Sequence, residues 1–138
     1  MFHALSEVRW SGVVFAFVPY FVLGGLWFTV FFPNAYRRSL GRETEPQEKP
    51  RPIFVIGPAI CSLVVTITTA VLLKALRIES YADGLQFGVW VGLGYLVANT
   101  VNIAINPNIP RPLFYGLISG GFHMVGILMV TAVLVAMR

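Results

Sequence analysis

Uncharged, apolar residues fall into four long runs that are separated by shorter polar segments. The runs cover residues 13–32, 52–73, 85–106 and 112–137, which is 20, 22, 22 and 26 residues with His123 counted as neutral. An α-helix rises about 1.5 Å per residue, so 20 residues cross the ~30 Å hydrocarbon layer of a bilayer. Because lipid offers the backbone no hydrogen-bond partners, each run is predicted to be a transmembrane helix.

The three connections differ in length and polarity. In the long polar loop 33–51, Gly41 is expected to close a short interfacial helix in a left-handed conformation. In the second connection, Ser80 or Asp83 can cap the third helix. Prolines at 107, 110 and 112 predict a rigid turn and an antiparallel hairpin of the third and fourth helices. We therefore predict an all-α protein, a single domain over residues 1–138 that forms an integral membrane four-helix bundle.

Composition supports a membrane protein. Hydrophobic residues make up 57% of the chain and charged residues 12%, against about 45–50% and about 25% in soluble domains. The net charge is +4, but no basic stripe accompanies it, and a nucleic-acid partner is not expected. The first run is longer than the ~7–15 apolar residues of a signal peptide and no cleavage site follows, so we expect a retained anchor.

Basic residues predict the orientation in the membrane. Six Lys and Arg residues lie on the side of the long loop and four on the side of the termini. The positive-inside rule then places the loop in the cytoplasm and both termini outside. The basic residues of the loop are also expected to contact anionic lipid head groups; they are Arg37, Arg38, Arg42, Lys49 and Arg51.

The third run carries polar and small residues at helical spacing. Steps of four and three residues place the whole set on one helix face; its members are Gly88, Gly92, Tyr95, Asn99, Asn102 and Asn106. Amides that face lipid are costly, so this face is predicted to point into the protein or toward a partner, with the glycines allowing close helix packing.

The fourth run has a matching stripe, which consists of Gly116, Gly120, His123, Ile127 and Val130, with Ser119 and Thr131 beside it. Equal distances from the turn predict two contacts between the runs, one between Tyr95 and His123 and one between Asn99 and Ser119. The second run offers a face of Ser62, Thr66 and Thr69, and the first offers Tyr20, Gly24 and Trp27.

His123 is the one ionisable side chain deep within a run. The simplest interpretation is a neutral histidine that bonds to a neighbouring helix. The alternatives are a proton relay, a metal ligand, or an axial ligand of the cofactors haem or chlorophyll. No second ligand and no carboxylate lies in any run, and no catalytic motif is present. We therefore expect no catalytic residues and no metal site, and no cofactor beyond that alternative at His123.

Two segments carry a family resemblance. The first is Gly24-Gly25-Leu26-Trp27-Phe28, followed by Phe32, Ala35, Tyr36 and Gly41, and the second is Gly121-Phe122-His123-Met124-Val125-Gly126, continuing to Arg138. With the four-span layout, they resemble the small bacterial membrane family known as domain of unknown function 1761. Phe28 and Phe122 stand where that family commonly has tyrosine, and Met137 where a tryptophan is expected. The resemblance implies a four-helix integral membrane protein and supplies no activity.

These observations favour a non-enzymatic membrane protein, an accessory or structural subunit of a larger membrane complex. Its partners would be membrane lipids and other membrane subunits, or further copies of itself. One alternative is a small homo-oligomeric transporter or channel with a polar interior around Asn99, Asn102 and His123. Another is a subunit that binds haem or pigment through His123.

Overall fold

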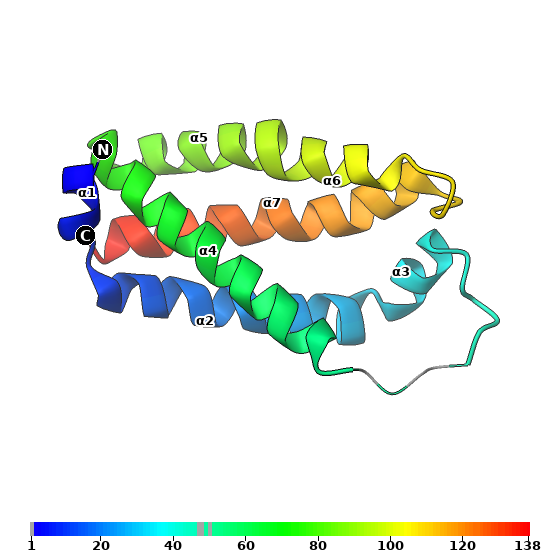
Figure 1. Cartoon of the computed structure of the whole chain (residues 1–138). Coiled ribbons are helices and arrows are strands. Elements are labelled where there is room, and N and C mark those ends of the chain that lie inside the picture. The colour runs from blue at the N-terminus through cyan, green and yellow to red at the C-terminus, as the bar shows by residue number, and fades with distance from the viewer. Residues whose placement is uncertain (1, 47–48, 50) are drawn as a thin grey trace.

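Four helical rods run along the computed structural model, which describes residues 2–46, 49 and 51–138 (Figure 1). Within that part every regular element is a helix, so the predicted all-α class is confirmed. Two short helices, α1 (Phe2–Ser6) and α3 (Pro33–Ser39), lie at opposite ends of the rods. The rods themselves are α2 (Trp10–Leu26) with the π-helical η1 (Trp27–Phe31), α4 (Ile53–Ala75), α5 (Tyr81–Val91) with η2 (Gly92–Val97) and α6 (Ala98–Ala104), and α7 (Pro112–Ala136).

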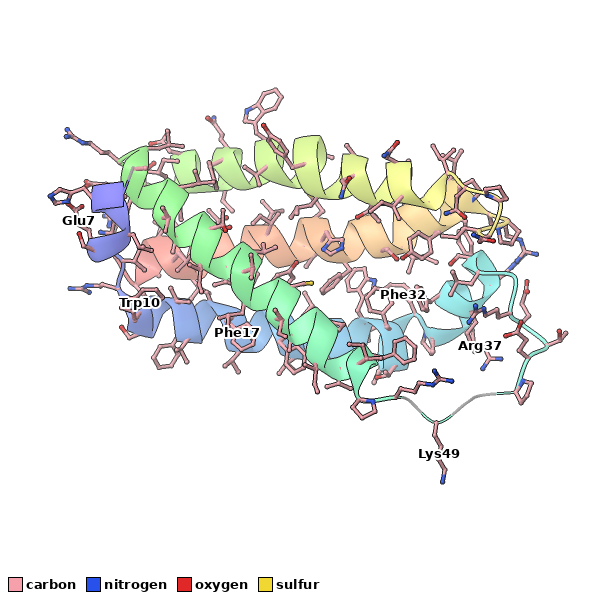
Figure 2. The ribbon with its side chains drawn as sticks, in the orientation of Figure 1. Glu7, Trp10, Phe17, Phe32, Arg37 and Lys49 are labelled. Carbon is pink, nitrogen blue, oxygen red and sulfur yellow. The ribbon has the colours of Figure 1, made fainter. Side chains whose placement is uncertain are left out.

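The four rods have the length and hydropathy of membrane spans. They contain 22, 23, 24 and 25 residues, and their mean hydropathies reach 2.0, 2.2, 1.3 and 2.0. At about 1.5 Å per residue, each is long enough to cross the hydrocarbon layer. Figure 2 shows charged side chains gathered at the two ends, with Glu7 at one end and Arg37 and Lys49 at the other. The chain is therefore a membrane protein with four apolar helices.

Helix α7 is the centre of the bundle. Half of its most apolar window is buried, against 17–22% in the other three rods. Figure 1 shows α7 between α2 and the α5–α6 rod, with α4 crossing the bundle diagonally. Ile127 and Val130 of α7 have no exposed surface. The α2 rod and the α5–α6 rod therefore pack mainly on α7, whereas α4 packs mainly on α2.

The third rod runs antiparallel to α7 along its whole length. Gly84 lies against Val135 near one end, and Gly116 lies against Val101 near the other. A Cβ atom at Gly84 would come within 2.9 Å of the Val135 side chain. The small residues therefore set how closely the two backbones approach, which is the usual basis of helix packing in membranes.

Two local signals in the sequence are confirmed. Gly41 has a φ of +69°, and its N–H donates to the Arg38 carbonyl at 3.1 Å while the Arg42 N–H donates to the Arg37 carbonyl at 3.0 Å. These two bonds form a Schellman cap, in which glycine is favoured because it lacks Cβ. At the start of α5 the Ser80 Oγ accepts from the Asp83 N–H at 3.0 Å.

The π-helical segment η2 changes the register of the third rod. After η2 the Ala98 N–H donates to the Leu93 carbonyl, five residues back, where an α-helix would use the residue four back. The face on α7 consequently steps from Gly92 to Val97, and then to Val101. One extra residue in a turn rotates everything after it by about 100° relative to a continuous α-helix.

Candidate functional site

A tyrosine and a histidine meet in the middle of the bundle. The Tyr20 hydroxyl lies 3.3 Å from His123 Nδ1, within hydrogen-bond distance, and the tautomer of the ring decides which group donates. Tyr20 is 1% exposed. Its ring fits against α7 because Gly126 has no side chain, and a Cβ there would collide with the ring. The pair joins the polar groups of α2 and α7 between the two packed helices.

The two segments that carry the family resemblance meet each other around this pair. Phe122 stacks on Tyr20 with ring centroids 5.4 Å apart and meets Phe28 edge-on at 5.4 Å. Gly24 lies directly under the Phe122 ring, where a Cβ would be 3.2 Å from it. The glycine and aromatic positions Gly24, Phe28 and Phe122 of the two segments therefore lie in the contact surface between α2 and α7.

Trp27 adds a second polar link between the same two helices. Its indole Nε1 donates to the Ile118 carbonyl at 3.0 Å. Trp27 also begins the π-helical η1, where the Phe32 N–H donates to the Trp27 carbonyl at 2.9 Å. An indole N–H in hydrocarbon needs a partner, and a helix carbonyl supplies it here without breaking α7.

Buried threonine hydroxyls of α4 and α7 donate within their own helices. Thr66 Oγ1 donates to the Ser62 carbonyl at 2.8 Å, and Thr131 Oγ1 donates to the Ile127 carbonyl at 2.7 Å. Both threonines have no exposed surface. The predicted face of α4 therefore lies inside the bundle and behaves there as apolar packing surface.

The asparagine face of the third rod points away from the bundle, so the alternative that it points into the protein is wrong, and the alternative that it faces a partner stays a prediction. Tyr95 is 75% exposed, and Asn99 and Asn102 are also exposed. The physical reason is η2, whose extra residue turns Val97 and Val101 toward α7 and carries the polar side chains outward. We call Tyr95, Asn99 and Asn102 the outward polar face.

Both predicted contacts between the third and fourth runs are consequently absent. His123 meets Tyr20 rather than Tyr95. Ser119 is buried in α7, and its Oγ has no hydrogen-bond partner among the described residues, so Asn99 does not reach it. A polar interior that combines Asn99, Asn102 and His123 cannot form within one chain of this shape.

The glycines of both stripes lie where helices touch. Gly88 and Gly92 of the third rod face Leu128 and Met124 of α7. Gly116 and Gly120 of α7 face the third rod, with Gly120 against Val97. These four positions are packing positions, because a Cβ at each would come within 3.1 Å or less of a neighbouring side chain.

The basic residues of the long loop hold the loop together as well as facing outward. Arg37 donates to the Arg42 carbonyl at 3.0 Å and to the Glu45 carbonyl. Arg111 bridges from the last turn to the Arg38 carbonyl at 2.5 Å and to the Glu43 carboxylate. The bond from Arg111 lowers the pKa of Glu43. Arg38, Arg42, Lys49 and Arg51 are exposed, and contact of these side chains with lipid head groups stays a prediction.

Helix α3 packs on the start of α7 through aromatic rings. Tyr36 lies between Phe28, at 4.8 Å, and Tyr115, at 5.9 Å, measured between ring centroids. Burial, with the neighbouring Tyr115, raises the pKa of Tyr36 to about 12. The Tyr36 hydroxyl is therefore harder to ionise than a tyrosine in water.

Sequence reasoning identified Tyr20 as a polar position but not as the partner of His123, since nothing in the spacing couples runs that are a hundred residues apart. It missed Val97 and Val101 because η2 has no signature in the sequence. Within the described residues, no group of three or more His, Cys, Asp or Glu side chains lies close enough to hold a metal ion. A haem or pigment ligand role for His123 stays a prediction.

Four apolar helices and an α2–α7 contact built from the two quoted segments define the class as a small integral membrane protein. The family model described as protein of unknown function (DUF1761) matches residues 11–135. The chain therefore belongs to this family. No curated protein and no solved structure matches the chain.

Proposed function

We propose that this chain is a non-enzymatic subunit of a larger membrane assembly, and that it joins the assembly through the outward polar face. One observation carries the proposal, namely that Tyr95 is 75% exposed beside exposed Asn99 and Asn102 on a membrane span. Asn99 lies five residues before the end of α6, which is about 7 Å into the helix, and Tyr95 lies about 13 Å in. Polar groups at such depths are costly against acyl chains unless they find a partner.

The backbone beside this face is open to a close neighbour. Nothing lies within 4 Å of a Cβ built at Gly94, and Ala98, one turn later, is exposed. Small residues four apart let a second helix approach, and interhelical hydrogen bonds from asparagine then stabilise the pair. Small and amide groups side by side favour a protein partner over lipid.

The inner polar groups support a structural role rather than a catalytic one. Tyr20 and His123 bond to each other across α2 and α7, and Trp27 bonds to a backbone carbonyl. Each of these groups is used to fix one helix against another. We also propose that the long loop faces the cytoplasm of a bacterial cell, since six of the ten Lys and Arg residues lie on its side.

A homo-oligomer is the second candidate, and the amide chemistry favours it. An asparagine side chain carries both donor and acceptor groups, so it can pair with the same residue of a second copy about a twofold axis. In that arrangement a transport path, if there is one, would lie between copies.

The test is photo-crosslinking in membranes from a reactive residue placed at Ala98. The control carries the same probe at Val64, which is 56% exposed on α4. We expect a protein adduct of defined mass from Ala98 alone, and about tenfold less of it when Asn99→Leu and Asn102→Leu are combined. An adduct of two chains identifies the homo-oligomer, and an adduct with another protein identifies the subunit role. Lipid adducts alone from both positions would overturn the proposal.

A further inference from the structure

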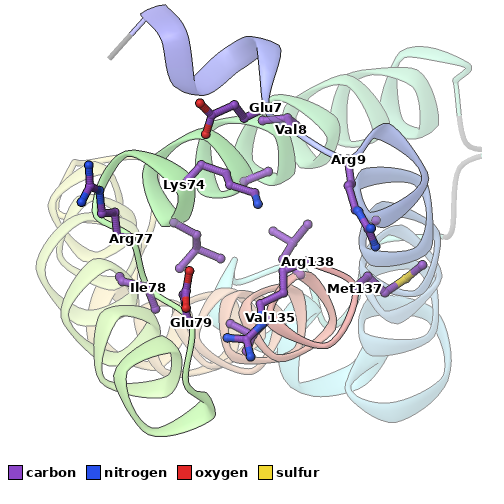
Figure 3. Close-up of a pocket in the computed structure, with 14 residues that line it drawn as sticks. Glu7, Val8, Arg9, Lys74, Arg77, Ile78, Glu79, Val135, Met137 and Arg138 are labelled. Carbon is purple, nitrogen blue, oxygen red and sulfur yellow. The ribbon is translucent and has the colours of Figure 1, made fainter.

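A cavity of about 550 Å³ opens at the end of the bundle opposite the long loop (Figure 3). It lies where the link from α1 to α2, the end of α4 and the end of α7 come together. Its floor is apolar and includes Val8, Leu73 and Val135, which are 5–6% exposed. Its volume falls in the range of about 300–1,000 Å³ that is usual for small-molecule sites.

Four basic side chains line this cavity, which are Arg9, Lys74, Arg77 and Arg138. The acidic side chains there are Glu7 and Glu79, so the basic groups outnumber them by two. Glu7 is engaged elsewhere, with an oxygen 3.0 Å from His3 Nδ1. In the part of the chain that the structure describes, none of the four basic groups has a carboxylate within 4.0 Å.

The backbone that presents one of these cations is strained. Arg77 has a φ of +55°, in the left-handed region. Its N–H donates to the Lys74 carbonyl at 3.1 Å, and the Ile78 N–H donates to the Leu73 carbonyl at 2.9 Å. This is the same Schellman cap that ends α3, where Gly41 occupies the left-handed position.

An arginine in a position that favours glycine needs a reason. The conformational free energy of the left-handed position is lower with glycine, because a residue with Cβ is disfavoured in that region. Strain of this kind is retained where the side chain has a use. The cap here directs Arg77 to the rim of the cavity, one turn from Lys74, whose amine Figure 3 shows directed into the hollow.

We propose that this cavity binds the phosphate group of an anionic phospholipid. The ends of α2, α4 and α7 lie at the level of the head groups when the rods span a bilayer, and there lipid phosphates are the most concentrated anions. Lys74, Arg77, Arg9 and Arg138 supply the charge, since basic pockets between membrane helices bind anionic head groups. The apolar floor accepts the glycerol and upper acyl carbons, which free phosphate lacks.

The test measures phosphatidylglycerol binding to the full chain by native mass spectrometry, with phosphatidylcholine as the competing lipid. Arg77→Gly removes one charge and places glycine, the favoured residue, in the left-handed position of the cap. Folding should therefore be unharmed. We expect about fivefold weaker phosphatidylglycerol binding in Arg77→Gly and about 25-fold weaker binding when Lys74→Gln is added. Arg111→Gln removes one charge at the opposite end of the bundle, where the exposed Arg111 is paired with Glu43; it is the control and should bind as wild type.

A further experiment separates the sources of phosphate. Sodium phosphate is titrated against the chain in phosphatidylcholine nanodiscs that also contain phosphatidylglycerol, and millimolar phosphate should not displace the bound phosphatidylglycerol. Equal binding of the two lipids, or equal binding by Arg77→Gly and Arg111→Gln, would overturn the proposal. Displacement by inorganic phosphate, with loss in the Arg77→Gly variant, would overturn the lipid as the source and identify a free phosphate ligand.

Discussion

At the scale of single residues, the distance between α2 and α7 depends on an absent side chain. The Tyr20 ring occupies the space where a Cβ at Gly126 would lie, and that ring is itself enclosed at 1% exposure. A rigid, buried ring cannot move aside as a long flexible side chain can. The Tyr20–His123 hydrogen bond therefore requires glycine at 126.

Gly126→Ala should destabilise the bundle by about 1–3 kcal/mol, because overpacking forces the two helices apart. Thermal unfolding in detergent measures the change. Gly25→Ala is the matched control, since Gly25 is also helical and nothing lies within 4 Å of its Cβ position. That control should match wild type or gain up to about 1 kcal/mol from helix propensity. Equal stability of the two variants would contradict the packing argument.

At the scale of the element, η2 acts as a one-residue insertion in a continuous helix. The contacts with α7 run through Gly88, Gly92, Val97 and Val101, at steps of four, five and four. Removal of one residue between Gly92 and Val97 makes every step four, which an α-helix accommodates on one face. The packing on α7 therefore does not depend on the extra residue of η2.

Deletion of Gly94 should leave the fold intact and its unfolding free energy unchanged, or higher by up to about 1 kcal/mol, because a helical glycine is lost. Deletion of Val125, which is exposed in the regular α7, should instead abolish folding by rotating the two halves of α7 against each other. The yield of monodisperse protein and its melting temperature measure both effects. A misfolded Gly94 deletion beside a folded Val125 deletion would show that η2 carries the packing.

At the scale of the whole molecule, charge is confined to the two ends and treated differently at each. On the loop side, Arg111 ties the turn before α7 to the long loop through Arg38 and Glu43. On the other side, the basic residues around the cavity have no carboxylate partner in the described part of the chain. At the loop end, Arg111 is therefore paired within the chain, whereas the basic residues around the cavity can bind a ligand.

The proposed orientation places the end of the bundle that carries the long loop in the cytoplasm. With Cys61→Ser as background, a cysteine at Thr44 should resist a membrane-impermeant maleimide in intact cells and react after lysis. A cysteine at Ser6, exposed at the opposite end, should react in intact cells. The opposite labelling pattern would show that the loop faces outward and that the excess of six basic residues over four does not set the topology.

Composition and neighbouring residues were enough to predict the four spans and two of the helix caps. Uncharged runs of 20 residues or more have to become helices in lipid, and the observed bounds differ from the predicted ones by at most four residues. The caps at Gly41 and Ser80 were equally predictable, because a left-handed glycine and a serine that accepts a backbone N–H act within one turn.

Packing between distant segments set which way the polar groups face and which residues they contact. A helical period assigns residues to one face only while the helix stays regular, and the extra residue of η2 turned Asn99 and Asn102 from the interior to the surface. Tyr20 found His123 because α2 packs on α7. The basic cavity exists because three separate segments end at the same height. Each of these outcomes depends on contacts between distant parts of the chain, which local spacing does not encode.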